Sequence, residues 1–150
     1  MTRHRSRALV GALAVVLLSA GCSTGHRDSD TSDGPAGVGG ATVLLNGQTA
    51  TDHGSEDVPA GGSQPIEVDS FYFNPTVLKG KAREKLTLTL TNESKIAHNF
   101  SVSEQSIDRD VPVGATVTVS LAFPSSGTLV FVCKFHRSTG MLGGLSVESG

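Results

Sequence analysis

Between residues 64 and 150, short segments of strictly alternating apolar and polar residues constrain the fold more than any other feature of the chain. One such segment is Leu86-Thr-Leu-Thr-Leu90, and another runs over residues 116–123. A repeat of two places the apolar side chains on one face of an extended strand, and no segment here has a convincing helical period. Since Gly, Pro and Asn separate the segments at turn-like positions, the pattern predicts an all-β domain, a β-sandwich over residues 64–150.

Two further segments of this region differ from simple alternation. Residues 128–133 are nearly all apolar, which is typical of a central strand covered on both faces. Residues 145–148 provide a last strand before the chain ends. A domain of these 87 residues is large enough for a two-sheet core without disulfides.

The amino terminus has the layout of a signal peptide, predicted over residues 1–21. Basic residues lie between Arg3 and Arg7, an apolar run covers residues 8–18, and small residues lead to Cys22. The apolar run is shorter than the roughly 20 residues that a membrane-spanning helix needs. Residues 18–22, Leu-Ser-Ala-Gly-Cys, resemble a bacterial lipobox, although the leucine lies one position earlier than usual. The resemblance implies lipidation of Cys22 and a protein anchored on the outer face of the cytoplasmic membrane, with cleavage and release as the alternative.

Residues 22–63 are rich in Gly, Ser, Thr and Asp, contain no aromatic residue, and are predicted to form a disordered linker. The apolar run Thr42-Val-Leu-Leu45 is the exception, since it could form an extra edge strand. The net charge of the whole chain is -2, and removal of residues 1–21 with their three arginines leaves -5. Such a charge does not predict nucleic-acid binding.

The cysteines suggest a metal site. Cys22 and Cys133 are the two in the chain, and a lipidated Cys22 cannot form a disulfide. Cys133 is then a lone thiol outside the cytoplasm, where oxidation or stray pairing is a liability. A bound metal would explain why such a residue is present.

Three candidate ligands of this metal lie within nine residues, because Cys133 is followed by His136 and Met141. A fourth is His98, which alternation places on the same face as Phe100 and Val102. Two imidazoles, one thiolate and one thioether suit a single copper ion that alternates between Cu(I) and Cu(II). Zinc is the weaker alternative, since it prefers four strong donors. Taken singly, His98 could be a core histidine and Met141 a gap filler.

These residues also carry a resemblance to plastocyanin-like cupredoxins, which covers roughly residues 73–147. The Cys-x-x-His-x-x-x-x-Met spacing is its specific part, and the further matching positions are Phe73-Asn-Pro75, Gly80, Asn92, His98-Asn99, Gly127-Thr128, Phe131, Gly143 and Val147. The resemblance implies a Greek-key β-sandwich with copper at one end. It also implies that His98, Cys133 and His136 are equatorial ligands and that Met141 is the weak axial one.

The chain departs from that family at two points. Ala97 stands where many plastocyanins have proline before the first histidine. Lys134, Arg137 and Lys95 lie near the ligands, in place of the acidic docking surface of plant members. A photosynthetic partner is therefore not to be assumed.

The expected function is electron transfer between extracytoplasmic redox proteins that dock transiently, by a monomer that is not an enzyme. Asn99 is predicted to tie the two ligand-bearing segments together, with an ordinary turn-side amide as its alternative role. His136 is expected to be the exit for the electron. Leu142, Gly143 and Gly144 are expected to form an apolar surface around it.

Three other functions remain open at this point. A copper storage or delivery protein would use the same four ligands, although such proteins often display several exposed methionines or histidines. A copper oxidase or nitrite reductase would need further copper centres, whereas residues 64–150 contain two histidines. A ligand-free adhesion domain would leave Cys133 unexplained.

Overall fold

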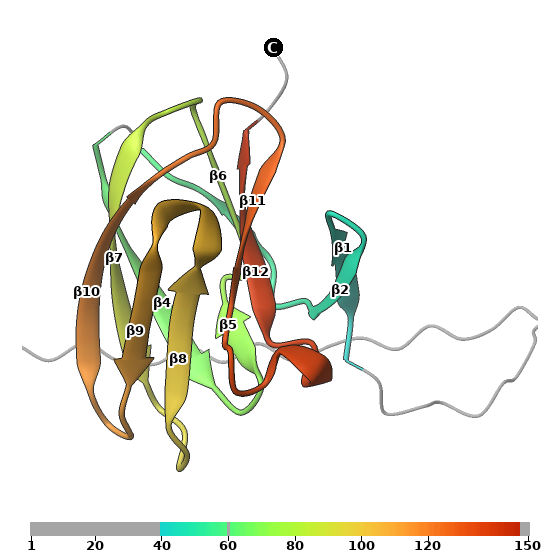
Figure 1. Ribbon diagram of the computed structural model, residues 1–150, viewed down its shortest axis with the longest axis vertical. Helices are drawn as coiled ribbons and strands as arrows, with labels where there is room; N and C mark the ends of the chain where they lie inside the picture. The colour runs from blue at the N-terminus through green and yellow to red at the C-terminus, as the bar shows by residue number, and fades with distance from the viewer. Residues whose placement is uncertain (1–39, 60, 148–150) are drawn as a thin grey trace, which may run out of the picture. The chain divides into compact units, whose positions relative to one another are not determined.

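The computed structural model describes residues 40–59 and 61–147, which form strands and two short 3-10 helices (Figure 1). None of the helices in these stretches has the length and apolar character needed to cross a membrane. In chain order the elements are β1 (Thr42–Leu45), β2 (Gln48–Thr51), β3 (Ser55–Asp57), β4 (Ser63–Asp69), β5 (Tyr72–Asn74), β6 (Val77–Gly80), β7 (Lys85–Asn92), β8 (His98–Val102), η1 (Ser103–Gln105), β9 (Ile107–Val111), β10 (Thr116–Ala122), β11 (Thr128–Val132), η2 (Arg137–Thr139) and β12 (Leu142–Val147).

Two large sheets form a sandwich. One has the strand order β10-β7-β4-β5 and the other the order β3-β6-β12-β11-β8-β9. The alternation in β7 places Leu86, Leu88 and Leu90 in the core and leaves the threonines between them half-buried. The parallel pairs β4 with β7 and β6 with β12 require crossovers rather than simple hairpins. The predicted all-β sandwich is confirmed.

Three fully buried aromatic rings, those of Phe73, Phe100 and Phe131, lie at the centre of the core. Their centroids are 5.0 to 6.0 Å apart, and Phe73 meets the other two edge to face. Gly143 in β12 allows this packing, because a Cβ there would overlap the ring of Phe131. Phe100 lies in β8, which begins with His98, and Phe131 lies in β11, which ends just before Cys133. This cluster therefore fixes both strands next to the candidate ligands.

Strand β11 is covered on both faces, as its apolar sequence predicts. It pairs with β12 on one side and with β8 on the other. Phe131 and Leu129 point into the core, whereas Val130 and Val132 pack on a second cluster formed by Leu45, Ala50 and Leu142. The final strand β12 begins at Leu142, three residues before the predicted start.

The second cluster belongs to a segment whose predicted structure is wrong. Residues 40–63 were expected to be part of a disordered linker, but β1 and β2 pair as a hairpin and β3 extends the larger sheet beside β6. The folded region therefore begins earlier than residue 64, and the alternative of a strand at 42–45 holds. The composition concealed these strands because few of their side chains are buried, and β3 is held by backbone pairing with all three residues exposed.

His53, which was expected to lie in the linker, follows β2. Its ring is exposed on one side and stacks on Tyr72 with the centroids 3.6 Å apart. The predicted signal peptide, Cys22 and residues 22–39 of the predicted linker lie outside the described residues.

Candidate metal centre

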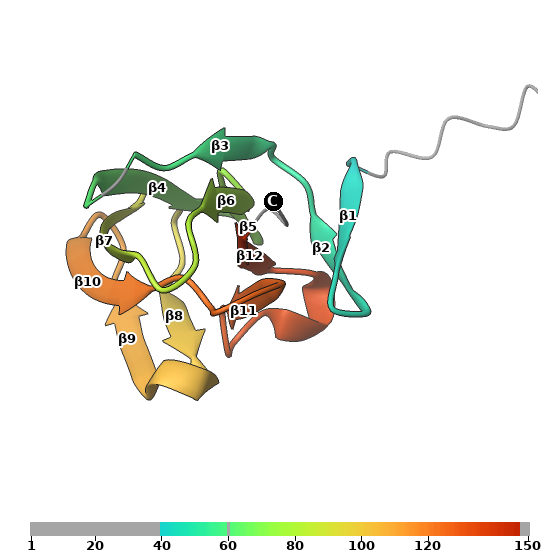
Figure 2. The same ribbon diagram turned by 90° about the horizontal axis from the view of Figure 1, so that it is seen from above.

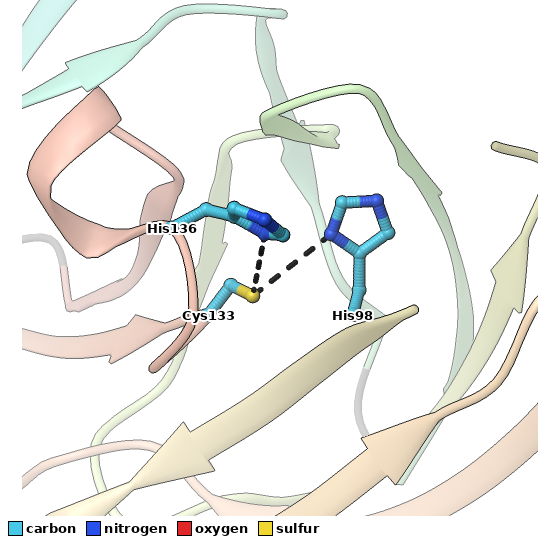
Figure 3. Close-up of side chains that lie close together, drawn as sticks. All are labelled: His98, Cys133 and His136. Carbon is cyan, nitrogen blue, oxygen red and sulfur yellow. Dashed lines mark hydrogen bonds between the residues drawn. The ribbon is translucent and has the colours of Figure 1, made fainter. Parts of the chain in front are cut away.

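Three of the predicted ligands converge at one end of the sandwich. His98 is the first residue of β8, Cys133 directly follows β11, and His136 lies in the loop before η2. The Sγ atom of Cys133 is 3.4 Å from Nδ1 of His136 and 3.9 Å from Nδ1 of His98. All three donor atoms lie within 4.8 Å of one another, and Figure 3 shows both rings directed toward the sulfur. No other group of three or more His, Cys, Asp or Glu residues in the described ranges has this geometry.

The ring of His98 is oriented from behind by Ser94. Nε2 of His98 lies 2.9 Å from the Ser94 hydroxyl oxygen, which is also bonded to Asn92 and to the Ile96 carbonyl. With the Nε2 proton donated to Ser94, Nδ1 presents its lone pair toward Cys133. Burial, and secondarily His136, lower the pKa of His98, so its ring is neutral near neutral pH and can act as a ligand.

Cys133 and Met141 are joined through the backbone. The amide of Cys133 donates to the Met141 carbonyl over 3.0 Å, so both ends of the loop meet at the end of β11 and the start of β12. Both side chains are fully buried, and Cys133 is a free thiol. Within the loop, the His136 carbonyl accepts the amides of Thr139 and Met141. Residues 133–141, called the ligand loop below, therefore close on themselves, and they carry three of the four predicted donors.

Asn99 lies between the two ligand-bearing segments. Its Oδ1 accepts a long hydrogen bond of 3.5 Å from the amide of Lys134, the residue after Cys133. Its Nδ2 donates to Asp108 over 2.7 Å and to Asp110 over 2.9 Å. Asn99 is fully buried and is hydrogen-bonded through both its Oδ1 and its Nδ2.

The two aspartates, which sequence reasoning missed, also bind the side chain of Lys134 at 2.7 and 3.4 Å. The hydrogen bond from Lys134 lowers the pKa of Asp108, and the same bond raises the pKa of Lys134. The positive charge of Lys134 near the ligands is therefore compensated locally. Arg137, another predicted basic residue, donates to Gln48 of β2.

His136 is the half-buried member of the set and lies between two aromatic rings. Phe71 meets it edge to face at 4.9 Å and Phe135 at 6.3 Å, and both phenylalanines are exposed. Phe71 has a φ of 72°, a conformation that is unusual for a bulky residue. The backbone thus bears a cost that places this ring on His136.

The predicted surface around His136 is wrong in its residues. Leu142, Gly143 and Gly144 are buried in β12 and covered by the core and by the β1–β2 hairpin. Sequence alone had no signal for Phe71, which reaches His136 from the β4–β5 turn, or for Ser94. The Phe71 contact joins segments that only the folded topology brings together, whereas Ser94 lies four residues before His98 and its contact depends on the conformation of the turn between β7 and β8.

The donor set fits copper better than zinc. Two imidazole nitrogens and one thiol converge in a site that buries His98 and Cys133 completely. Met141, which carries the thioether, accepts a backbone hydrogen bond from the amide of Cys133. Thiolate and thioether sulfur favour Cu(I), and imidazole accepts both valences. A zinc site would prefer a fourth strong donor, which Met141 is not.

Comparison with known proteins identifies the family. Residues 40–145 match the model of the cupredoxin-like domain, and the chain therefore belongs to the cupredoxin-like family. This fold binds one copper ion, and His98, Cys133, His136 and Met141 have the arrangement of a type 1 site. The predicted resemblance and the predicted copper are both confirmed. The matched range includes the β1–β2 hairpin, in agreement with the corrected start of the domain.

Solved structures agree on the fold. Auracyanin B is 17% identical with a TM-score of 0.51, and the match covers 61% of this chain and 91% of that one. The metal-binding domain of the Cu(I)-exporting P-type ATPase of Streptococcus pneumoniae, solved with Cu(I), is 13% identical with a TM-score of 0.53, covering 65% and 98%. At such identities the likeness concerns the fold alone. No curated protein sequence matches the chain.

Proposed function

We propose that this protein is a single-electron carrier that uses one type 1 copper ion to connect redox partners outside the cytoplasm. The observation that carries the proposal is the burial of the donor set. His98 and Cys133 are fully buried on or beside strands, whereas His136 reaches the surface between Phe71 and Phe135. Such a site protects the thiol and leaves one ring edge through which an electron can pass to a docked partner.

When bound, copper supplies a one-electron couple. The chain's own residues keep the surroundings of that couple constant. Ser94 holds the ring of His98, and Asn99 links β8 to Lys134 beside Cys133. Ligands fixed by strands and hydrogen bonds need little movement when the charge changes, which favours rapid electron transfer.

The exposed rings of Phe71 and Phe135 support brief docking of redox partners. Single apolar side chains around one ligand give a small contact area, which suits weak redox encounters. We propose that the protein acts as a monomer and is not an enzyme. The support for the second part is that one donor cluster converges within the described residues, whereas an oxidase needs further centres.

We further propose export and lipid attachment through Cys22. The support is the sequence of residues 1–22, with its basic, apolar and small-residue regions. The expected result is that Cys22→Ser moves the protein from the membrane fraction to the soluble fraction of the cells. An unchanged distribution between the two fractions would contradict lipidation at this residue.

Copper storage or delivery is the second candidate. The fold is shared with the Cu(I)-loaded domain of an exporting ATPase, so a delivery role deserves a direct test. Full burial of His98, Cys133 and Met141 argues against it, because a recipient protein would have no access to these donors. Slow loss of copper to a chelator together with rapid electron self-exchange would favour the carrier, and the reverse would favour delivery.

The main test is a titration of the metal-free protein with Cu(II). We expect an intense blue colour from thiolate-to-copper charge transfer, and we expect Cys133→Ser to abolish it. Cys22→Ser is the matched control, because it removes the other cysteine and should leave the colour unchanged. A colourless wild-type protein, or a blue Cys133→Ser variant, would refute the proposed site.

A further inference from the structure

The β1–β2 hairpin lies directly against the ligand loop. Figures 1 and 2 both show the hairpin beside η2 and the start of β12, the elements that surround Met141. The hairpin forms its own two-stranded sheet and pairs with neither large sheet. Its contacts with the rest of the protein are therefore what determines its role.

The first contact holds the residue before Met141. The amide of Thr51 donates to the Gly140 carbonyl over 3.0 Å. The backbones approach so closely that a Cβ at Gly140 would lie 3.3 Å from Oγ1 of Thr51 and 3.5 Å from the Thr49 carbonyl oxygen. Gly140 also has a φ of 85°, which glycine adopts without a steric penalty. This loop position is thus shaped to receive β2.

The second contact holds the residue after Met141. Leu142 is 2% exposed and packs with Leu45 and Ala50 of the hairpin. Leu45 is 6% exposed, whereas its neighbour Leu44 points to solvent and is 69% exposed. Removal of the Leu45 side chain would therefore leave Leu142 without much of its cover.

A third contact reaches the helical turn of the loop. Gln48 accepts two hydrogen bonds from the guanidinium of Arg137, at 2.6 and 3.1 Å through Oε1. Arg137 begins η2, directly after His136. The hairpin therefore touches the ligand loop at its helical turn and on both sides of Met141.

We propose that the β1–β2 hairpin is a latch that positions Met141, with Leu45, Gln48 and Thr51 as its positioning residues. The thioether of Met141 would be the weakest of the four donors to copper, so the protein itself would have to hold the residue that carries it. Both chain neighbours of Met141 are held by the hairpin, so loosening the hairpin should disturb the backbone around Met141 more than distant core strands such as β7. The inference rests on the proposed function, in which Met141 would be one of the four copper ligands.

The test begins with Leu45→Ala in the full-length metal-free protein, measured by amide hydrogen exchange. The amides of Met141 and Thr51 should exchange roughly tenfold faster or more, because a cavity opens beneath Leu142. Leu44→Ala is the matched control and should stay within about twofold of wild type. The amide of Leu88 in β7 reports global opening. Equal acceleration at Leu88 and Met141 would overturn the latch and indicate a general loss of stability.

The copper-loaded proteins supply the second readout, the paramagnetic-resonance spectrum and the reduction potential. Both should shift in Leu45→Ala and in Gln48→Ala, whereas Leu44→Ala should match wild type. Leu45→Met keeps the side-chain volume and Gln48→Glu keeps the hydrogen-bond acceptor. Both variants should therefore give the wild-type spectrum and reduction potential. If Leu45→Ala does not fold, Gln48→Ala still decides, because its contact lies at the surface.

Failure of the latch can be distinguished from failure of the proposed function. A wild-type protein that stays colourless with Cu(II) refutes the copper carrier, whatever the hairpin variants do. A blue wild-type protein whose spectrum, potential and loop amide exchange are unchanged in Leu45→Ala and Gln48→Ala refutes the latch alone.

Discussion

His98 and the ligand loop reach the same site but are held in different ways. His98 lies in β8, a strand paired on both sides, and its ring is oriented by Ser94 from within the fold. The loop of residues 133–141 carries three of the four donors and is supported from outside by the β1–β2 hairpin. A single ligand can thus be fixed by the sheet that carries it, whereas a loop with several ligands needs a second layer of protein.

The largest effect is expected from a substitution in the aromatic core, which supports both the strand of His98 and the strand that leads into the ligand loop. Phe73→Ala should lower the free energy of unfolding by about 3–5 kcal/mol, because Phe73 packs on Phe100 of β8 and on Phe131 of β11. Denaturant unfolding of the metal-free protein measures this change. Phe135→Ala is the control, since its ring is 51% exposed and should cost no more than about 0.5 kcal/mol. Similar losses in both variants would show that the aromatic core is not the common support.

A smaller effect is expected from a substitution that removes only the support of the His98 ring. Ser94→Ala leaves Nε2 of His98 without its partner, so affinity for copper should fall by about 10- to 100-fold. Competition with a chelator of known affinity measures the change. Ser103→Ala, an exposed serine in η1, should leave the affinity unchanged. Faster exchange of the loop amide of Met141 in Ser94→Ala would contradict the separation of the two parts.

The smallest effect is expected from substitutions of glycine that test the contact between the ligand loop and β2. Gly140→Ala and Gly127→Ala should each lose about 1–2 kcal/mol of unfolding free energy, because both glycines have a positive φ. A new Cβ meets nothing within 4 Å at Gly127 but lies 3.3 Å from Thr51 at Gly140. The copper spectrum should therefore change in the Gly140 variant and not in the Gly127 variant. Equal spectra in the two variants would mean that the contact with β2 does not influence the site.

Much of the fold could be predicted from sequence because it follows from local patterns. The alternation in β7 and β10 is set by one buried face, and each pattern lies within a single strand. The Cys133, His136 and Met141 spacing also lies within one loop, and the placement of His98 follows from the period of β8. Local information was sufficient for these features.

Of the β1–β2 hairpin, the sequence suggested only a possible strand at residues 42–45, because the signal for the rest lies elsewhere in the chain. Val130 and Val132 make β11 apolar on its outer face, which implies that some segment covers that face. Residues 42–51 are that segment, but only Leu45 and Ala50 among them are buried, so their own sequence carries little signal of a covered face. The contacts of Ser94, Asp108 and Phe71 could not be predicted for a related reason. Phe71 reaches His136 only because the topology brings two distant turns together, whereas Ser94 and Asp108 depend on the exact shape of the β7–β8 turn and the register of β8 with β9.

The close approach of Gly140 to Thr51 has a consequence for protein engineering. Ligand loops of this kind are natural pieces to transplant between scaffolds, because their donors are contiguous in sequence. Here the unit to be transplanted consists of two separate segments, since residues 42–51 pack against residues 137–142 from the outside. A chimera that received residues 133–141 alone would gain the donors but would lack the hairpin contacts that hold the loop backbone in its conformation.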